Sequence, residues 1–385
     1  MKTFLDVFAG AGGLSLGLTQ AGWFQVGSVE SWPDAVKTHR QNFQRQPVFN
    51  GDITQISADT VLHSCLERPQ WIVGGPPCQG FSTVGRRDRT DPRNILVEHF
   101  ARIVAELNPE GFIIENVLGL RDMRFITRVQ ELFSPIGYRV SPVILTAAEY
   151  GVPQLRRRIF FVGDSRGLGF VKPHPIYQPN EFVSVWDAIG DLPPLQPGEC
   201  KTVYEVEAST DYQEKLRASS EEISSHHASR HPKYLVEAIS HIPDGGNRRS
   251  IPDNLQPASG YHNSYSRLHS ASPAVAVTQN MGKPSGTRCI HPFQNRGLTA
   301  REGARLQGFP DSFQFVGGMI SQRLQVANAV PPLLARAVGT AVLTDDNWVA
   351  SPEKAEARNK THAELDAATP KEAGTPTSSE YLAAE

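Results

Sequence analysis

Cys78 has the sequence surroundings of a nucleophile. It follows the apolar residues 71–73 in the segment Gly74-Gly75-Pro76-Pro77-Cys78-Gln79. Glycines and prolines at the carboxyl end of a buried strand would fix one thiol at the mouth of a sheet, where neighbouring groups can activate it. None of the four cysteines has the CxxC spacing of a zinc ribbon, and we interpret the remaining ones as packing or surface residues: Cys65, Cys200 and Cys289.

A carboxylate follows a second apolar run. Residues 112–114 are Phe-Ile-Ile and lead into Glu115-Asn116-Val117. A carboxyl group that leaves a buried strand into a cleft can stay protonated and act as a general acid, whereas an isolated glutamate can also cap a helix. Opposite a thiolate, such an acid would suit cytosine chemistry. The thiolate adds to carbon 6 while N3 is protonated, and carbon 5 then becomes nucleophilic enough to attack a methylsulfonium.

Two basic segments could hold a base or an anion. In residues 154–158, Gln-Leu-Arg-Arg-Arg, an extended backbone would place Arg156 and Arg158 on one face and Arg157 on the other. Their guanidinium groups could bind a base carbonyl, a phosphate or the carboxylate. The second segment follows the cysteine and has the composition of a lid that binds phosphates, with Arg86, Arg87 and Arg89. The alternative for the first segment is a solvated basic run, and the alternative for the second is a plain surface loop.

A glycine-rich turn near the N-terminus indicates a nucleotide-like ligand. Phe8-Ala9-Gly10-Ala11-Gly12-Gly13 lies between an apolar run and a helical pattern, so its backbone can approach a ligand closely. Ser15 stands where GxGxxG has its third glycine, which disfavours NAD and FAD. Glu30, about twenty residues on, could accept hydrogen bonds from both ribose hydroxyls. A cofactor with an adenosine and no pyrophosphate fits this pattern; a structural turn with an exposed glutamate is the alternative.

These candidates must be positioned by alternating strands and helices. We expect helices at residues 14–20, 34–42 and 94–106, and strands at 4–8, 24–30, 48–49, 71–73, 111–114, 140–145 and 159–162. The alternation predicts an α/β fold with a Rossmann-like, mostly parallel sheet covered on both faces. Ligands of such sheets bind outside the carboxyl ends of the strands, where the cysteine, the glutamate and the glycine turn are all expected.

The rest of the chain has a different texture. From residue 171 to about 295, prolines and polar residues are frequent and the alternation disappears, and helices are expected again at 298–307 and 322–343. We therefore predict a catalytic domain of residues 1–170 plus 321–345, and a smaller, loop-rich domain with its hinge at 171–320. Residues 346–385 have little apolar content, so we expect a disordered tail there.

Composition narrows the class of protein. The chain has 385 residues, of which 39% are hydrophobic and 20% charged, and a formal net charge of -2. These values are typical of a soluble globular protein, so a polyanionic partner would need a local basic patch. Asp6 and the glycines after it argue against a signal peptide, and no apolar run has the length of a membrane span. His227 and His231 lie four apart without a further ligand, so no metal site is expected.

The ordered set of motifs resembles the cytosine-5 DNA methyltransferases, over roughly residues 1–345. The turn at 8–13 is similar to the family's first cofactor motif, Glu30 to its ribose-binding acid, and Gly51-Asp52-Ile53 to its adenine-side motif. The segments around Cys78, Glu115 and Arg158 are similar to its nucleophile, glutamate and arginine motifs. RGLTAREGARLQGFP at 296–310 and QVANAV at 325–330 are similar to its ninth and tenth motifs.

The resemblance implies an S-adenosyl-L-methionine-dependent enzyme that holds a flipped cytosine in its cleft. Cys78 would add to carbon 6, Glu115 would protonate or hydrogen-bond N3, and Arg158 would contact the base carbonyl. Asn116 and Arg156 would hold the catalytic loop and its neighbours. The cofactor would be bound by Phe8, Gly10, Gly12, Gly13, Glu30, Trp32, Asp52, Ile53, Pro77 and Asn328. The DNA would be bound by Gln79, Ser82, Arg86, Arg87 and Arg89.

The resemblance also implies the partners. The loop-rich domain would read bases of double-stranded DNA in the major groove. We expect a monomeric bacterial enzyme in the cytoplasm, associated with the nucleoid when bound to DNA, and either orphan or paired with a restriction endonuclease for the same site. Two positions depart from the family pattern. Ser31 follows Glu30 directly, with Trp32 one later, where an aromatic residue often stacks on adenine; Ala327 stands where a glycine commonly precedes the asparagine.

Three other functions fit parts of the pattern. One branch of the family methylates cytosine in transfer RNA, although a recognition region of this size favours DNA. A catalytically silent DNA-binding protein would not need Cys78, Glu115 and Arg158 together. A dinucleotide-dependent oxidoreductase fits the glycine turn poorly and leaves the same three residues without a role.

Overall fold

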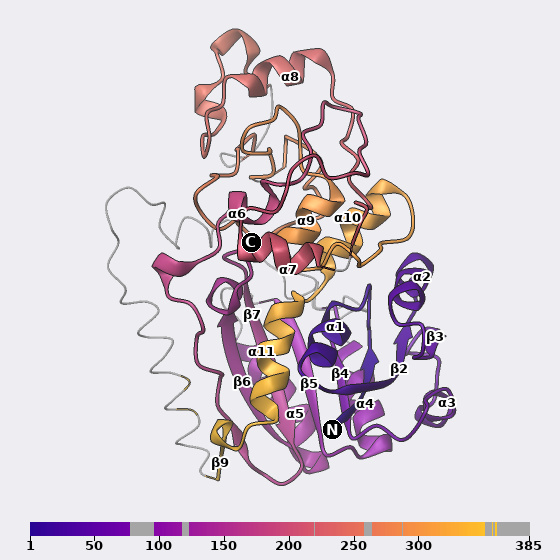
Figure 1. The fold of residues 1–385 in the computed structure, drawn as a ribbon. Coiled ribbons are helices and arrows are strands. Elements are labelled where there is room, and N and C mark those ends of the chain that lie inside the picture. Colours follow the sequence, from indigo (N-terminus) through magenta and orange to yellow (C-terminus); the bar gives the residue numbers. More distant parts are fainter. Residues whose placement is uncertain are drawn as a thin grey trace.

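A seven-stranded sheet forms the centre of the lower half of the molecule (Figure 1). The computed structural model describes residues 1–77, 96–117, 123–218, 220–257, 264–286 and 288–350, together with Glu356 and Asn359. The strand order is β3-β2-β1-β4-β5-β7-β6. The strands are β1 (Thr3–Val7), β2 (Phe24–Glu30), β3 (Val48–Asn50), β4 (Trp71–Gly74), β5 (Gly111–Val117), β6 (Arg139–Thr146) and β7 (Arg157–Asp164). The first five are parallel, whereas β7 runs antiparallel to both β5 and β6, so the predicted mostly parallel α/β sheet is confirmed.

Helices cover both faces of the sheet because side chains along each strand alternate between them. On β5, Phe112 and Ile114 belong to one buried cluster and Ile113 to another. The first cluster packs under α3 (Ala58–His63), α4 (Leu96–Leu107) and α5 (Met123–Phe133); the second packs under α1 (Gly13–Gln20) and α11 (Pro332–Val342). Helix α2 (Pro33–Asn42) lies beside β3 at the edge. Within the described ranges, no helix has the length and apolar character needed to cross a bilayer.

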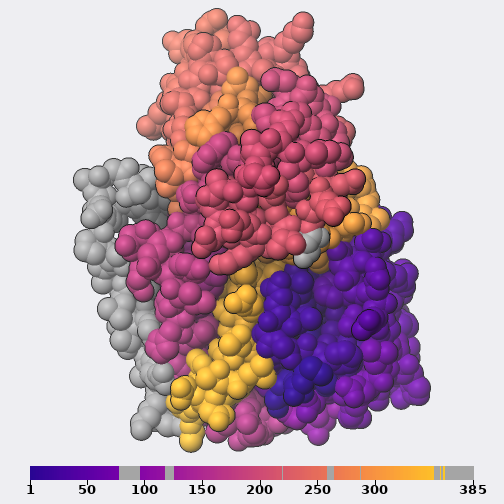
Figure 2. All heavy atoms as spheres, viewed as in Figure 1, coloured from indigo at the N-terminus to yellow at the C-terminus, as the bar shows by residue number. Residues whose placement is uncertain are grey.

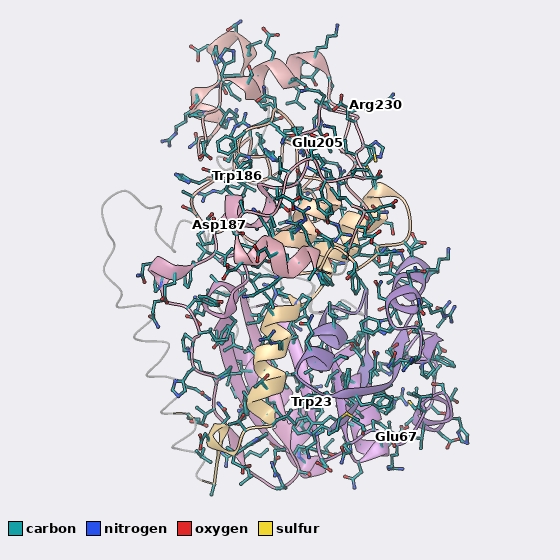
Figure 3. The ribbon with its side chains drawn as sticks, viewed as in Figure 1. Trp23, Glu67, Trp186, Asp187, Glu205 and Arg230 are labelled. Carbon is teal, nitrogen blue, oxygen red and sulfur yellow. The ribbon has the colours of Figure 1, made fainter. Side chains whose placement is uncertain are left out.

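The C-terminal helix α11 lies directly on α1, about 310 residues before it in the chain (Figures 1 and 2). A Cβ on Gly13 would overlap the carbonyl oxygen of Val330, and one on Gly17 would overlap that of Pro332. Trp23, labelled in Figure 3, donates its indole N–H to the carbonyl of Gly339 at 3.0 Å. The two glycines allow close contact between the backbones, and α11 covers the same face of the sheet as α1.

Residues 185–318 form the upper part of the molecule and consist of loops and short helices, whereas residues 171–173 still lie beside the sheet, where Val171 N donates to the carbonyl of Asn347 (Figures 1 and 2). The helices are α6 (Val185–Ile189), α7 (Asp211–Arg217), α8 (Lys233–Ser240) and α9 (Ala300–Leu306), and α10 (Met319–Asn328) then returns toward the sheet. Two single 3-10 turns precede this region, η3 (Ser134–Ile136) and η4 (Ala147–Tyr150). Three more lie after residue 171: η5 (Pro179–Glu181), η6 (Arg248–Ser250) and η7 (Asp253–Leu255). The core of the upper part continues into the lower half, since Ala11 and Phe43 pack in one cluster with Phe309 and Phe313.

Buried ion pairs hold the loops of the upper part together. Arg296 and Glu302 form a two-point pair, with Nη2–Oε1 at 2.6 Å and Nη1–Oε2 at 2.9 Å. Arg305 contacts two carboxylates, Asp191 at 2.7 Å and Asp311 at 2.6 Å. Burial alone would raise the pKa of Glu302, but the Arg296 guanidinium holds it well below its usual range. Because an unpaired charge in such a site is costly, losing either partner would loosen the loops it joins.

Two boundaries differ from the sequence-based expectation. The helix expected at 322–343 is two helices, α10 and α11, because Pro331 and Pro332 lack the N–H groups needed to continue α10. The tail expected from residue 346 is ordered in its first residues: Asp345–Asn347 form a 3-10 turn (η8), and Trp348–Val349 (β9) pairs with Gly169–Phe170 (β8). The anchor is a single large side chain in an otherwise polar segment, which an average over the tail does not reveal.

Trp348→Ala should therefore destabilise the lower half although it lies outside the expected domain. The ring of Trp348 packs on Phe170 and Trp71, with centroids at 5.2 and 6.4 Å, and its N–H donates to the carbonyl of Val342. We expect the free energy of unfolding to fall by about 2 kcal/mol, less than for a fully buried tryptophan. Urea denaturation measures it. Ile320→Ala, at a side chain that is 80% exposed, is the control, and an equally small effect of both changes would contradict the anchoring role.

Candidate active site

Several of the predicted site residues that the structure describes lie at one edge of the sheet. Strands β1 to β5 are parallel neighbours, so the segments that follow their carboxyl ends lie side by side. These segments carry the turn around Gly10 after β1, Glu30 at the end of β2, Asp52 after β3 and Pro77 after β4, with Glu115 on β5. The sheet therefore brings the two sets of candidates, cofactor-binding and catalytic, to one place.

The carboxylate of Glu30 is oriented by backbone N–H groups. Oε2 accepts from Gly10 at 2.7 Å, and Oε1 accepts from Ser31 and Trp32, both at 2.8 Å. An ionised carboxylate offers about four acceptor positions, and three are used here. Glu30 can thus accept from one further hydroxyl as it stands. Accepting from both hydroxyls of a ribose would require it to share a position or to release one backbone donor.

The backbone of the glycine turn adopts conformations that residues with a side chain rarely adopt. Phe8 has φ 61° and Gly12 has φ 99°, both in the left-handed region. A Cβ on Gly12 would also overlap the ring of Phe43, whereas the Cα of Gly10 faces open space. Strain of this kind persists where the surrounding structure imposes it, and it concentrates at ligand sites. The turn is therefore shaped to leave room for a ligand over Gly10.

Two buried polar groups below the turn were missed in the sequence. Asp6 on β1 accepts a hydrogen bond from Ser15 Oγ at 2.6 Å, and burial, with Glu30 nearby, raises the pKa of Asp6 to about 7. His39 on α2 lies against Phe43 and 2.9 Å from Gln25, and burial lowers its pKa to about 3, so its ring is neutral. The available signals were a carboxylate within an apolar strand and a serine in place of the third glycine.

Glu115 and Arg158 form a shielded ion pair. They lie on the antiparallel strands β5 and β7, and Arg158 Nε is 3.0 Å from Glu115 Oε1, with side chains only 5% and 11% exposed. The guanidinium orients the carboxylate at this distance. The protonated form of Glu115 expected from the sequence stays a prediction.

Asn116 connects this pair to the segment that precedes Cys78. Its Nδ2 donates to the carbonyl of Pro76 at 3.1 Å, and its Oδ1 accepts from Val117 N at 2.8 Å. A Cβ on Gly75 would lie 3.3 Å from Glu115 Oε2, so the glycine lets the two strand ends approach. The predicted residues Cys78, Gln79, Ser82, Arg86, Arg87 and Arg89 lie outside the described residues.

Arg156 has contacts different from those of Arg158. Its Nη1 donates to the carbonyl of Val277 at 3.2 Å and its Nη2 to that of Ala327 at 3.0 Å. Arg156 and Arg158 are buried and Arg157 is half-buried, in agreement with the alternation expected from the sequence. Arg156 therefore binds the upper part and the end of α10, whereas Asn116 contacts the segment beside the cysteine.

The remaining cofactor candidates lie on separate segments. Asp52 is exposed and accepts from Thr54 N at 2.9 Å, and Ile53 is buried with its carbonyl bound by Arg102 at 2.8 Å. Trp32 is half-buried directly before α2. Asn328 is exposed at the last residue of α10, two residues before Val330, whose carbonyl packs on Gly13.

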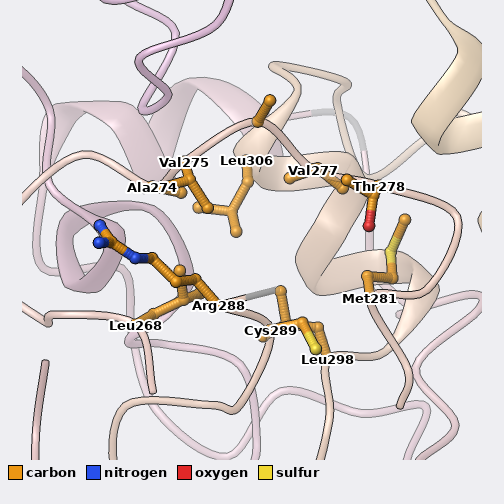
Figure 4. A pocket seen from close by; sticks show the side chains of 11 residues that line it. Leu268, Ala274, Val275, Val277, Thr278, Met281, Arg288, Cys289, Leu298 and Leu306 are labelled. Atoms are coloured by element: carbon orange, nitrogen blue, oxygen red, sulfur yellow. The ribbon is translucent and has the colours of Figure 1, made fainter. Parts of the chain in front are cut away.

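Two of the other cysteines, Cys65 and Cys289, are poor nucleophiles. Burial raises the pKa of Cys65 to about 11 and that of Cys289 to about 12. Cys289 also donates to the carbonyl of Lys283 and lines a small, mostly apolar cavity in the upper part (Figure 4). A thiol held protonated in this way does not attack an electrophile.

Comparison with known proteins assigns the class. The fold is that of the S-adenosylmethionine-dependent methyltransferases: a solved structure assigned as a DNA modification methyltransferase encoded within a prophage (E. coli) matches with a TM-score of 0.73 and 27% identity, over 89% of this chain and 99% of that chain. The chain belongs to the family of C-5 cytosine-specific DNA methylases, whose family model matches residues 2–344. It is accordingly a DNA cytosine-5 methyltransferase.

Curated relatives cover nearly the same length. The Type II methyltransferase M1.HphI of Haemophilus parahaemolyticus is 41% identical over 348 residues, which are 89% of this chain and 86% of the relative. The Type II methyltransferase M.DdeI of Desulfomicrobium norvegicum is 37% identical over 365 residues, which are 87% of this chain and 86% of the relative.

S-Adenosylmethionine, the methyl donor that this family implies, fits the turn. The open space over Gly10 lies beside an oriented carboxylate, and such a carboxylate suits a ribose hydroxyl. Ser15, which stands where GxGxxG has its third glycine, is fully buried and donates to Asp6, so it is not available to a ligand.

Asp6→Asn should change how stability depends on pH. Because the pKa of Asp6 is about 7 in the folded protein and about 3.9 in an unfolded chain, the folded protein keeps a proton that the unfolded chain releases. This contribution is complete below about pH 4 and is lost as the pH rises through 7, at up to about 1.4 kcal/mol per pH unit. The wild type should therefore lose stability relative to Asp6→Asn between pH 4 and 7 in urea titrations. Asp253→Asn, at an exposed aspartate, should follow the wild type; parallel curves for Asp6→Asn would contradict the buried proton.

Proposed function

We propose that this enzyme methylates one cytosine within a short, specific sequence of double-stranded DNA, through a covalent adduct with Cys78. The observation that carries the proposal is the Glu115–Arg158 pair beside the segment that leads into the cysteine. An acid and a cation held within hydrogen-bond reach of each other, together with the thiol that follows Pro77 in the sequence, provide what addition to cytosine requires.

The chemical steps follow from these side chains. The target cytosine rotates out of the helix into the cleft, and the Cys78 thiolate adds to carbon 6. Arg158 contacts the base carbonyl, and Glu115, after taking up a proton from solvent, donates it to N3 as the thiolate adds. Carbon 5 then takes the methyl group, for which bound S-adenosylmethionine would supply the electrophile. A base removes the proton from carbon 5, the bond between carbon 6 and sulfur breaks, N3 returns its proton to Glu115, and Cys78 leaves as the thiolate.

The cofactor is proposed to lie over the glycine turn. Glu30 accepts from the ribose, Asp52 and Ile53 lie on the adenine side, and Trp32 is the candidate for stacking on the adenine ring. Further contacts come from the backbone and side chains of Phe8, Gly10, Gly12, Gly13, Pro77 and Asn328. The support is their common position at the carboxyl edge of the sheet, where ligands of such folds bind.

Sequence recognition is proposed for residues 171–320, with residues 1–170 and 321–345 as the catalytic unit. Loops held by buried ion pairs can vary at their exposed tips without loss of the core, which suits direct reading of bases. Gln79, Ser82, Arg86, Arg87 and Arg89 are proposed to grip the DNA around the flipped base. The names of the relatives place them in Type II systems, so a companion endonuclease for the same site is the proposed partner of this monomeric enzyme.

The proposal is tested by expressing the protein in a bacterial host that lacks cytosine methylation and sequencing the host DNA after bisulfite conversion. Protected cytosines should recur in one short context, and the Cys78→Ser variant, produced at the same level, should leave every cytosine converted. Protection by Cys78→Ser at the wild-type level would refute the covalent mechanism. Complete conversion with soluble wild-type protein would refute DNA as the substrate and make transfer RNA the next nucleic acid to test.

Glu115→Gln should remove the proton-binding group with little change in shape. We expect the methyl-transfer rate in single-turnover assays to fall about 10²- to 10⁴-fold, because an amide cannot take part in proton transfer to N3. Binding of DNA in gel-shift assays should persist. Glu110→Gln is the matched control, since this exposed carboxylate pairs with Lys2 at the opposite end of β5. A rate equal to that of the control would exclude Glu115 from the chemical step.

A further inference from the structure

Two fully buried glutamines face each other where the upper part meets the sheet. Gln154 Nε2 donates to Gln307 Oε1 at 3.1 Å and to the carbonyl of Leu306 at 2.9 Å. Gln154 lies just before β7, and Gln307 lies at the end of α9. Amide groups without access to water are costly unless bonded, so a paired arrangement of this kind defines one geometry.

Gln307 continues the network to the end of α10. Its Nε2 donates to the carbonyls of Val326 at 2.8 Å and Ala329 at 3.4 Å, and Arg156 donates to that of Ala327 between them. The last carbonyls of a helix have no partner within the helix. Gln307 and Arg156 supply such partners and hold the end of α10 in place.

The same side chains hold a segment of the upper part. Val277 N donates to Gln154 Oε1 at 2.8 Å, and the Val277 carbonyl accepts from Arg156. Gln154 also pairs with Ala274 through the backbone in a parallel bridge. Val277 and Leu306 line the cavity of Figure 4 from neighbouring segments. Three segments far apart in the sequence thus bond to one pair of amides.

We propose that Gln154 and Gln307 are positioning residues that set Asn328 against the cofactor turn and keep the recognition segment in register with it. Asn328 is exposed, and the residues on both sides of it are held by buried side chains. Two residues later, the carbonyl of Val330 packs on Gly13. The inference rests on the proposed cofactor role of Asn328 and adds how its place is determined.

The amide of Gln307 uses its oxygen as an acceptor and its nitrogen as a donor, so a substitution that removes only the donor tests its role. It accepts once and donates to two carbonyls, so the near-isosteric Gln307→Glu places a carboxylate against two carbonyl oxygens. Gln322→Glu is the matched control, because Gln322, on α10, also donates to two carbonyls, those of Phe315 at 3.1 Å and Gly317 at 3.0 Å. Both changes lose donors to carbonyls, but only one alters the end of α10 beside Asn328.

The test is calorimetric titration of the full-length variants with S-adenosylmethionine, together with their melting temperatures. Both substitutions should lower the melting temperature, and Gln307→Glu alone should weaken binding about tenfold, with Gln322→Glu within about twofold of the wild type. Binding as tight as in the wild type by folded Gln307→Glu would overturn the inference and leave a purely structural pair.

A variant that does not fold would be replaced by the neutral Gln307→Met, measured in the same way. It cannot donate but adds no charge, and it should still bind the cofactor several-fold more weakly than the wild type. Unchanged affinity in this variant would likewise overturn the inference. Failure of the wild type itself to bind S-adenosylmethionine would refute the proposed cofactor site instead, so the two failures are distinguishable.

Discussion

The contact between the backbones of α1 and α11 is the constraint on which the rest of the site depends. Two glycines on α1 admit the carbonyls of Val330 and Pro332, and no side chain could stand between them. Because α1 follows the glycine turn and α11 follows Asn328, this contact brings the two ends of the matched region to one edge of the sheet. Position is thus transmitted through backbone packing, which has less freedom than contacts between long side chains.

The upper part solves a different problem. Loops bury little regular backbone, and many of their polar groups must find side-chain partners. Arg296, Arg301 and Arg305 are fully buried, and they bond to carboxylates and to carbonyls of segments distant in sequence. A scaffold of this kind fixes the bases of the loops through charge, so the exposed tips need not contribute to the core.

The strands, and the edge of the sheet at which the candidate site lies, could be predicted from the sequence, because both depend on local patterns. Apolar runs ending in glycine, proline or a carboxylate indicate strand ends, and parallel strands put those ends on one edge. The partners of Arg156 could not be predicted, since they are backbone carbonyls at Val277 and Ala327, and a carbonyl has no signature in a sequence. The same reason conceals the role of Gln307. The sequence left open whether Arg158 binds the carboxylate of Glu115, because the contact is made across antiparallel strands that the alternation of elements does not determine.

The packing of the last helix on the first has a consequence for synthesis on the ribosome. The apolar face of α1, with Leu14 and Leu18, is covered by α11, which emerges about 310 residues later. At typical translation speeds this delay is roughly 15 to 60 seconds, during which the face must remain exposed or be covered by another protein. The nascent chain of this enzyme would therefore depend on chaperones more than a domain of the same size whose neighbours in space are neighbours in sequence.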